Sequence, residues 1–272
     1  MPYPEWGQWW VDGRPEPASA DRGLQFGDGL FETMAVLDGQ IRFLDRHLSR
    51  LARGCRVLGI HQPAPLQEDL LKLASGCTRA VIKLVVTAGV GGRGYSRPVT
   101  LAPRVHMARF PWPEGLPDAL RIRVCEQRLS RQPALAGIKH CNRLEQVLAR
   151  RELEGEDCEE GLLQDTADNV IEGVAANIFV VSDGRLRTPA LDQAGVAGIM
   201  REWVLERSEA IGVPASESVL RLTDVMAADE VFMSNSLIGI CPVLSLLGQE
   251  MTRSWSCGPV TQKLMGELSE CR

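Results

Sequence analysis

The feature that most limits how this chain can fold is the connector PWPEGLP, residues 111–117. Three prolines and a glycine in seven residues cannot continue a helix or a central strand, and such segments commonly join domains as stiff linkers. The chain has 272 residues and 44% hydrophobic content, which is enough for a sizeable core on either side. We therefore predict an N-terminal domain over residues 1–112, a linker over 113–119 and a larger C-terminal domain over 120–272.

The N-terminal part of the chain alternates between strand and helix patterns. Residues 31–44 alternate in polarity around Asp38-Gly39, a pair that is typical of a two-residue hairpin turn. Asp45 has the position of a helix start, because apolar residues follow it at helical spacing. A buried strand is expected over residues 80–89, with a second strand just before the connector. This order of elements predicts an α+β domain.

The segment GIKHCNRLEQVLARR, residues 137–151, begins with a lysine and continues as a helix. Asn142 and Glu145 have the spacing of a capping box, with asparagine in the Ser/Thr place. Lys139 would then lie outside the helix, just before it. The apolar residues at helical spacing are expected to form the buried stripe of this helix, and they are Leu144, Val147 and Leu148.

The remainder of the C-terminal part is rich in short strands. Asp183-Gly184 marks a second hairpin turn, and a helix that ends near Gly212 is expected after the small-residue segment AGVAGIM, residues 194–200. A further helix is expected at the C-terminus. The whole chain is therefore predicted to form two α+β domains of unequal size.

Composition argues against several classes of function. The net charge is −5 and the pI is near 5.5, so we expect no nucleic-acid partner. No apolar stretch is long enough to span a membrane, and the four histidines lack metal-ligand spacing, so neither a membrane partner nor a metal is expected. The eight cysteines are scattered and no signal-peptide pattern precedes them, which favours reduced thiols in a cytoplasmic protein.

Two charged residues lie in apolar surroundings. Lys139 follows Ile138, and it is either a solvated surface lysine or a desolvated amine whose lowered pKa would allow it to form Schiff bases. Glu172 lies in the run NVIEGVAANIFV, and it is either an edge-strand glutamate that faces water or a carboxylate that faces a cationic partner. A protonated pyridine nitrogen would be such a partner.

Three further elements could bind an anion. The small residues of AGVAGIM precede a helix, whose first N–H groups would be available to an anion, although the pattern is not that of a nucleotide P-loop. Arg50 would by default be a solvated helix charge, and the hydroxyls of Ser234 and Ser236 could bind phosphate or cap a turn. Together, a lysine, an acid, a helix terminus, an arginine and serines are the set that a pyridoxal 5'-phosphate enzyme needs.

The order and wording of these pieces resemble, nearly end to end, the fold-type IV pyridoxal phosphate enzymes. That family contains the D-amino-acid and branched-chain aminotransferases and the 4-amino-4-deoxychorismate lyases. The segments that carry the resemblance are DRGLQFGDGLFET, GIKHCNRLEQVLARRE, DNVIEGVAANIFVV, TPALDQAGVAGIMR and ADEVFMSNSLIGICPV. Within the family, KHCNRLEQVLARRE, LDQAGVAGIMR and GGRGYS are most similar to the lyases. The resemblance implies a smaller N-terminal α/β sandwich domain and a C-terminal domain with a barrel-like β core.

The resemblance also implies roles for individual residues. Lys139 would bond to the cofactor aldehyde and carry the proton in catalysis, and Glu172 would pair with the pyridine nitrogen. Asn177 would support the ring side of the cofactor. The residues expected to hold the phosphate are Arg50, Gly198, Ile199, Met200 and Ser236. The residues expected to meet the substrate are Arg93, Tyr95 and Asn235, of which the arginine suits a carboxylate.

Two departures from the family pattern bear on the substrate. Several relatives have an arginine where this chain has Ala88, so that anion-binding role is missing or has moved. Some aminotransferases have serines after the glutamate, where this chain has EGVAAN, residues 172–177. Both departures weaken the aminotransferase interpretation more than the lyase interpretation.

The expected activity is that of a carbon–oxygen lyase, which releases 4-aminobenzoate and pyruvate from 4-amino-4-deoxychorismate for folate synthesis. The alternatives are an aminotransferase for D- or branched-chain amino acids, a silent pyridoxal phosphate binder or scaffold, and a Schiff-base aldolase without cofactor. The expected partners are a small-molecule substrate and, by resemblance, a second copy of the chain in a homodimer.

Overall fold

The chain forms two compact units in a computed structural model that describes residues 10–11, 14–15, 21–91, 94–97, 99, 102–248 and 252–270. The first unit consists of Met1–Glu114 and Ile138–Asn142, and the second consists of Gly115–Gly137 and Arg143–Arg272. The predicted connector contains the junction at Glu114. The domain limits proposed from the sequence place Lys139 in the C-terminal domain, whereas its segment packs in the first unit.

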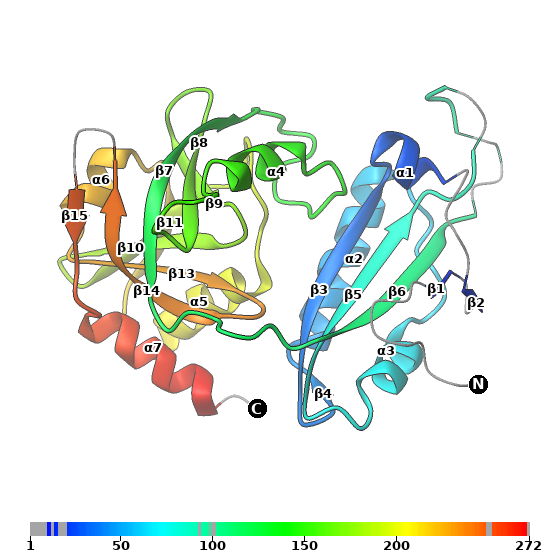
Figure 1. Cartoon of the computed structure of the whole chain (residues 1–272), viewed down its shortest axis with the longest axis horizontal. Coiled ribbons are helices and arrows are strands. Elements are labelled where there is room, and N and C mark those ends of the chain that lie inside the picture. Colours follow the sequence, from blue (N-terminus) through cyan, green and yellow to red (C-terminus); the bar gives the residue numbers. More distant parts are fainter. Residues whose placement is uncertain are drawn as a thin grey trace. The chain divides into compact units, whose positions relative to one another are not determined.

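The first unit is an antiparallel sheet with two longer helices, and Figure 1 shows α2 running along one face of the sheet. The strand order is β2-β1-β6-β5-β3-β4. The elements are β1 (Trp10–Val11), β2 (Arg14–Pro15), α1 (Arg22–Phe26), β3 (Gly29–Leu37), β4 (Gln40–Ile41), α2 (Leu44–Leu58), α3 (Gln67–Ala74), β5 (Arg79–Thr87) and β6 (Arg104–Pro111).

Strand β3 has one buried face and one partly exposed face. Leu30 and Met34 alternate with Phe31 and are buried, because α2 packs on their side. At Gly54, an added Cβ would lie 2.7 Å from a Leu30 methyl carbon, so glycine permits the close approach of α2. The hairpin predicted at Asp38-Gly39 is confirmed, since both residues have positive φ between β3 and β4.

The segment Ile138–Asn142 attaches to the free side of β3 at its start. Phe31 N donates to Lys139 O at 3.0 Å, and Cys141 N donates to Gly29 O at 2.9 Å. An antiparallel bridge joins Leu30 to His140. The segment therefore acts as a short extra strand, and its side chains follow the in-and-out alternation of β3.

The second unit is a nine-stranded mixed sheet with four helices among the described residues. The sheet order is β12-β11-β10-β13-β14-β7-β8-β9, with β15 paired to β14. The elements are β7 (Leu120–Leu129), α4 (Leu144–Arg151), β8 (Glu160–Asp165), β9 (Val170–Gly173), β10 (Asn177–Ser182), β11 (Arg185–Pro189), α5 (Ile199–Ala210), β12 (Ala215–Ser218), α6 (Leu222–Ala227), β13 (Glu230–Asn235), β14 (Gly239–Leu247), β15 (Thr252–Ser254) and α7 (Pro259–Glu270).

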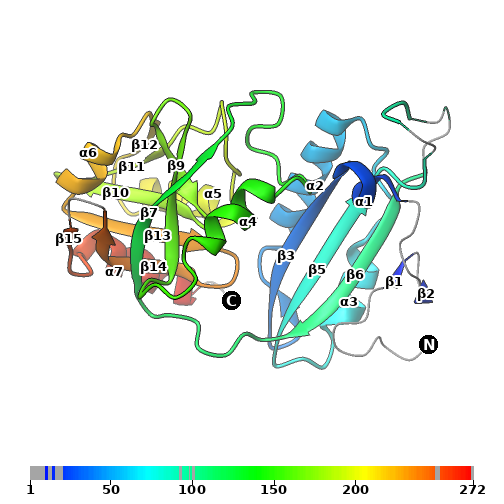
Figure 2. The ribbon, with the colours of Figure 1, turned by 45° about the horizontal axis from the view of Figure 1, so that its top comes forward.

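The second sheet curls toward a barrel, and Figure 2 shows its strands wrapping around a common core. An antiparallel bridge joins Val170 of β9, at one edge, to Leu220, just beyond β12 at the other edge. Apolar side chains fill the curl, among them Ile122, Ile178 and Met233, each fully buried. The predicted fold class, two α+β domains with a barrel-like second core, is confirmed.

Helix α4 differs from its prediction in two respects. No side chain caps its N-terminus: Asn142 Nδ2 donates instead to Gly27 O at 3.2 Å, and Glu145 accepts the hydrogen bonds of Ser130. The predicted capping box is therefore wrong, because tertiary partners compete for both side chains. The predicted buried stripe is also wrong, since Leu144 is 76% exposed and Val147 is 53% exposed. No helix among the described residues could cross a membrane.

Candidate active site

Lys139 lies outside α4, as the sequence predicts, in the segment that pairs with β3. Its Nζ lies 4.4 Å from the centroid of the Phe31 ring, and the side chain is partly buried. An amine that lies over an aromatic face, on a backbone fixed by a strand, has a defined position. These contacts favour the desolvated amine over a freely solvated surface lysine.

Arg50 lies on the buried face of α2 and forms a double ion pair with Glu32 of β3. Its Nε donates to Glu32 Oε1 at 2.8 Å, and its Nη2 donates to Oε2. His47 Nδ1 lies 2.6 Å from the same Oε2. Burial alone would raise the pKa of Glu32, but Arg50 and His47 outweigh it and lower that pKa to about 2. Arg50 is only 5% exposed, so the default interpretation as a solvated charge is wrong.

Glu32 and His47 were not predicted as site residues. Glu32 pairs with the predicted phosphate-binding Arg50, and His47 contacts Glu32. The signal was present: Glu32 lies between Leu30 and Met34 in the alternation of a strand, at a position that should be buried. A carboxylate at such a position needs a cationic partner. Burial lowers the pKa of His47 and Glu32 opposes this, while the charges of Arg50 and Lys139 lower it further, so the group is electrostatically coupled to Lys139.

The glycine-rich loop after β5 is described in part. Arg93 lies outside the described residues. Tyr95 is 86% exposed, and its ring lies 5.4 Å from the ring of Phe26. The guanidinium of Arg22 donates to the carbonyl oxygens of Tyr95 at 2.8 Å and of Ser96 at 3.2 Å. An anchored backbone therefore presents Tyr95 to solvent, where a ligand could reach it.

Glu172 is buried at the end of β9, which excludes the water-facing alternative. Its Oε2 accepts the N–H of Val196 at 2.8 Å. Asn177, at the start of β10, donates from Nδ2 to the carbonyl oxygen of Val196, also at 2.8 Å. Glu172 and Asn177 thus both hydrogen-bond to Val196. Glu172 binds its N–H group, and Asn177 binds its carbonyl group.

Gly198 precedes helix α5, and the buried residues Ile199 and Met200 begin it. A Cβ at Gly198 would overlap Asn177 Oδ1, so this position requires glycine while Asn177 keeps its place. No side chain hydrogen-bonds to the N-terminus of α5 as a cap. The first N–H groups of a helix have no acceptor within the helix, and together with the helix dipole they suit an anion.

The turn after β13 contains the remaining predicted residues. Asn235 Oδ1 accepts the N–H groups of Leu237 and Ile238, each at 2.9 Å, and its Nδ2 donates to Ala175 O at 3.2 Å. Asn235 therefore shapes the turn that contains Ser236. Ser234, which lies opposite Asn177 in the β10–β13 register, has a buried hydroxyl oxygen without a hydrogen-bond partner among the described residues.

Each unit has residues whose chemistry suits a part of a pyridoxal phosphate cofactor. In the second unit, Glu172 supplies a buried carboxylate for a ring nitrogen, the start of α5 supplies N–H groups for a phosphate, and Ser234 has unused hydrogen-bonding capacity. In the first unit, Lys139 supplies an amine for an aldehyde, and Arg50 supplies a fixed cation. In the second unit, Glu172 and Asn177 both hydrogen-bond to Val196, next to the start of α5.

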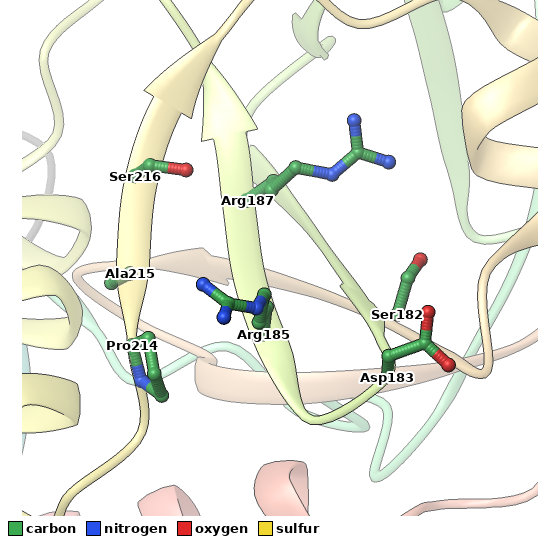
Figure 3. Close-up of a pocket in the computed structure, with 7 residues that line it drawn as sticks. All are labelled: Ser182, Asp183, Arg185, Arg187, Pro214, Ala215 and Ser216. Carbon is green, nitrogen blue, oxygen red and sulfur yellow. The ribbon is translucent and has the colours of Figure 1, made fainter.

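A cavity of about 340 Å³ lies elsewhere in the second unit (Figure 3). The strands β11 and β12 supply most of its lining, and Arg187, one of its two arginines, already pairs with Asp224 at 3.2 Å. The lining residues are Ser182, Asp183, Arg185, Arg187, Pro214, Ala215 and Ser216. None of the predicted site residues lines it, so this cavity is separate from the candidate active site.

Comparison with known proteins assigns the chain to a family. The family described as Amino-transferase class IV matches residues 29–246. The chain belongs to the class IV aminotransferase family. Its fold-type IV resemblance is thereby confirmed, and the enzyme uses pyridoxal phosphate.

Lyases are among the similar proteins. The aminodeoxychorismate lyase of Vibrio harveyi is 37% identical over 270 residues, covering 96% of this chain and 99% of the relative. The crystal structure of 4-amino-4-deoxychorismate lyase from Pseudomonas aeruginosa is 45% identical with a TM-score of 0.91, covering 96% of this chain and 98% of that one. The branched-chain aminotransferase of Thermoproteus uzoniensis with norvaline is 26% identical with a TM-score of 0.83, covering 97% and 93%.

Proposed function

We propose that this enzyme converts 4-amino-4-deoxychorismate into 4-aminobenzoate and pyruvate. The observation that carries the proposal is the identity of 37% to the lyase of Vibrio harveyi and 45% to that of Pseudomonas aeruginosa, against 26% to the branched-chain aminotransferase of Thermoproteus uzoniensis, over nearly the whole length of each chain. The position of the partly buried Lys139 over the Phe31 ring and the burial of Glu172 support catalysis rather than silent binding of the cofactor. Formation of 4-aminobenzoate places the reaction in folate synthesis.

Lys139 acts in this proposal first as nucleophile and then as base and acid. It would hold the cofactor through its aldehyde, and in the substrate complex its amine would be free to carry protons. The freed amine then takes the proton from the ring carbon that bears the nitrogen. It returns a proton to the methylene carbon of the departing enolpyruvate, which becomes pyruvate while the ring becomes aromatic. When bound, the cofactor supplies a ring that accepts the electrons of the broken C–H bond.

Glu172 would pair with the ring nitrogen of the cofactor, and Asn177 holds the Val196 carbonyl group in place. The phosphate would be held by Arg50, Gly198, Ile199, Met200 and Ser236. Arg93, Tyr95 and Asn235 would meet the substrate. The support is the family match over residues 29–246, together with the ion pair of Arg50 and the uncapped start of α5.

We also propose a homodimer in the cytoplasm. The exposed apolar residues of α4 support an interface, because contiguous apolar surface is typical of protein contacts; they are Leu144, Val147 and Leu148. The seven described cysteines are free, which suits a reducing compartment. Light scattering should give twice the chain mass of 29.9 kDa. A mass of one chain at micromolar concentration would contradict the dimer.

The test of the reaction uses 4-amino-4-deoxychorismate, generated in place from chorismate by a synthase. We expect equal release of 4-aminobenzoate and pyruvate without any keto acid, and loss of both in Lys139→Ala. The visible absorption band of the lysine-bound cofactor should also disappear in that variant. No release from a wild-type protein that shows the band, followed by turnover once a keto acid is added, would instead establish an aminotransferase.

A further inference from the structure

A buried glutamate in the second unit has no role in the site described so far. Glu160 begins β8 and is 7% exposed. Its Oε1 accepts the N–H groups of Gly161 at 3.0 Å and of Val174 at 2.9 Å. Burial of a carboxyl group is costly unless such hydrogen bonds satisfy it. The two bonds therefore fix the carboxyl group and the donating backbone in one arrangement.

Val174 belongs to the turn that joins β9 to β10. Glu172 lies near the end of β9, just before this turn, and Asn177 begins β10, just after it. Gly173 N closes the turn by donating to Ala176 O at 2.6 Å. The turn therefore determines how the two side chains proposed to support the cofactor ring lie relative to each other.

Gly173 lets Glu160 lie close against this turn. A Cβ atom at Gly173 would lie 3.2 Å from Glu160 Cγ and 3.3 Å from its Cδ, which is tighter than most contacts of a real side chain. The φ of Gly173 is not positive, so the backbone itself does not require glycine. The limited space beside Glu160 favours glycine at this position.

The same turn is connected to the turn after β13. Ala175 O accepts a hydrogen bond from Asn235 Nδ2 at 3.2 Å. Asn235 also accepts the N–H groups of its own turn, which contains the predicted phosphate-binding residue Ser236. By holding Val174, Glu160 thus supports a backbone connection that reaches residues predicted to bind the ring and the phosphate.

Glu160 and Glu172 project from opposite faces of the β8–β9 pair. Gly173 lies opposite Leu162 in the register, and a Cβ at Gly173 would point toward Glu160. Neighbouring residues of a strand project from opposite faces, so Glu172 points away from this side. An effect of Glu160 on Glu172 therefore passes through the backbone of the turn.

We propose that Glu160 is a positioning residue for the cofactor. It fixes the turn between β9 and β10, and through that turn it keeps Glu172 and Asn177 in their hydrogen bonds to Val196, next to the start of α5. The inference rests on the cofactor roles proposed above for Glu172, Asn177 and Ser236. It deepens that proposal, because these residues then depend on one buried side chain behind the turn.

The test compares two substitutions of Glu160 in the holoenzyme. Glu160→Leu removes the oxygen that accepts the N–H groups of Gly161 and Val174, whereas Glu160→Gln keeps one. We expect Glu160→Leu to speed release of the cofactor about 10- to 100-fold, the usual cost of losing a residue that supports a binding site. Glu160→Gln should restore most of the loss. The measurement is the decay of the visible band of the lysine-bound cofactor after dilution into buffer that contains a scavenger of free pyridoxal phosphate.

The position of the band before dilution is a second readout. A displaced Glu172 changes the charge next to the ring nitrogen of the cofactor, so Glu160→Leu should shift the band in the same direction as Glu172→Gln. Gly173→Ala is a milder variant for the case that Glu160→Leu does not fold. Its methyl group would displace the Glu160 carboxyl group from the turn, and we expect changes of the same direction and smaller size.

Glu230→Leu is the matched control. Glu230 is 5% exposed in the same unit and also accepts two backbone N–H groups, from Val260 at 3.0 Å and Thr261 at 2.8 Å, but these belong to α7. It lies at the opposite end of β13 from Asn235. Hydrogen exchange should show that Glu230→Leu destabilises the second unit, while cofactor release stays within about twofold of the wild type, because distant sites act independently.

Failure of this inference and failure of the lyase proposal are distinguishable, because neither readout needs the substrate. Release rates and band positions that match the wild type in both Glu160→Leu and Gly173→Ala would overturn the role of Glu160. Equal acceleration of release by Glu230→Leu would also overturn it, since lost stability would then explain the effect. Absence of 4-aminobenzoate release, together with the expected differences in cofactor release, would overturn the lyase proposal and support the role of Glu160.

Discussion

The two groups of site residues are built in different ways. In the first unit, the side chains of Glu32, His47 and Arg50 hold one another through charge, and the backbone takes no part in the bonds between them. In the second unit, Glu172 and Asn177 hold the backbone of a third residue, and a glycine makes room for one of them. Substitutions in the first group should therefore act mainly through the loss of a charge. Substitutions in the second group should act mainly through the loss of steric fit.

The largest effect is expected when Glu32, which contacts both Arg50 and His47, loses its charge. Glu32→Gln leaves Arg50 buried without its counter-ion, which should lower the free energy of unfolding of the first unit by about 3–5 kcal/mol. Hydrogen exchange of peptides from β3 and α2 measures this for the first unit separately. Glu68→Gln removes the exposed ion pair with Lys72 and should have a much smaller effect, because solvent screens both charges. Equal effects of the two variants would contradict the role of burial.

The next effect separates charge from shape in the second unit. Glu172→Gln keeps an oxygen that can accept the Val196 N–H, but it removes the negative charge. We expect kcat/KM to fall about 100- to 1,000-fold with little change in unfolding. Glu217→Gln, which removes a half-exposed partner of Arg201 in the same unit, should leave kcat/KM unchanged. Retention of full activity by Glu172→Gln would exclude a charged partner for this residue.

The two units should also respond to pH in opposite directions. The pKa of Glu32 is lowered to about 2, so its contribution to stability is present above pH 4.5 and is lost as the pH falls toward 2. Burial raises the pKa of Glu160 on β8 to about 7, although the N–H groups of Gly161 and Val174 oppose it. Its contribution is therefore present below pH 4.5 and is lost as the pH rises through 7.

A variant tests the contribution of Glu160. Glu160→Gln cannot ionise, so the second unit should keep the stability that the wild type loses between pH 5 and 8, roughly 3 kcal/mol. Hydrogen exchange of β8 and β9 peptides at both pH values, corrected for intrinsic rates, gives the comparison. Glu154→Gln, at an exposed position, should retain the wild-type slope. An unchanged slope in Glu160→Gln would refute the assignment.

The smallest effect concerns shape alone. A methyl group at Gly198 would displace the Asn177 side chain, so Gly198→Ala should destabilise the second unit by roughly 1–2 kcal/mol and weaken cofactor retention. The matched control is Gly266→Ala in α7, where a Cβ meets no atom within 4 Å and should stabilise the helix slightly. Opposite signs are expected in thermal unfolding of the holoenzyme. The same sign for both would show that the space around Gly198 is not limiting.

Features that depend on residues close in the sequence were predicted correctly. Asp38-Gly39 and Asp183-Gly184 form the predicted hairpin turns, because aspartate and glycine both tolerate the positive φ values that these turns need. The position of Lys139 outside a helix followed from the pattern after it. Resemblance pointed to Glu172 and Asn177, whose roles stay predictions, but not to the hydrogen bonds that both make to Val196.

Features that depend on distant parts of the chain were missed. Helical spacing shows that Leu144, Val147 and Leu148 share a face, but it does not show whether anything covers that face. Asn142 had a competing acceptor more than 100 residues away in sequence, at Gly27. Glu32 was overlooked because its partners lie on the next helix, although the alternation of the strand already required a cation.

The placement of Ile138–Asn142 has a consequence for how the protein could be divided. The chain passes between the two units three times, because this segment belongs to the first unit while both its neighbours belong to the second. No single cut yields two fragments that match the two units. A gene fragment for residues 120–272 would encode Lys139 but not the strand that fixes its backbone. The backbone of the lysine takes its native position only when this segment pairs with β3, which lies far away in the sequence.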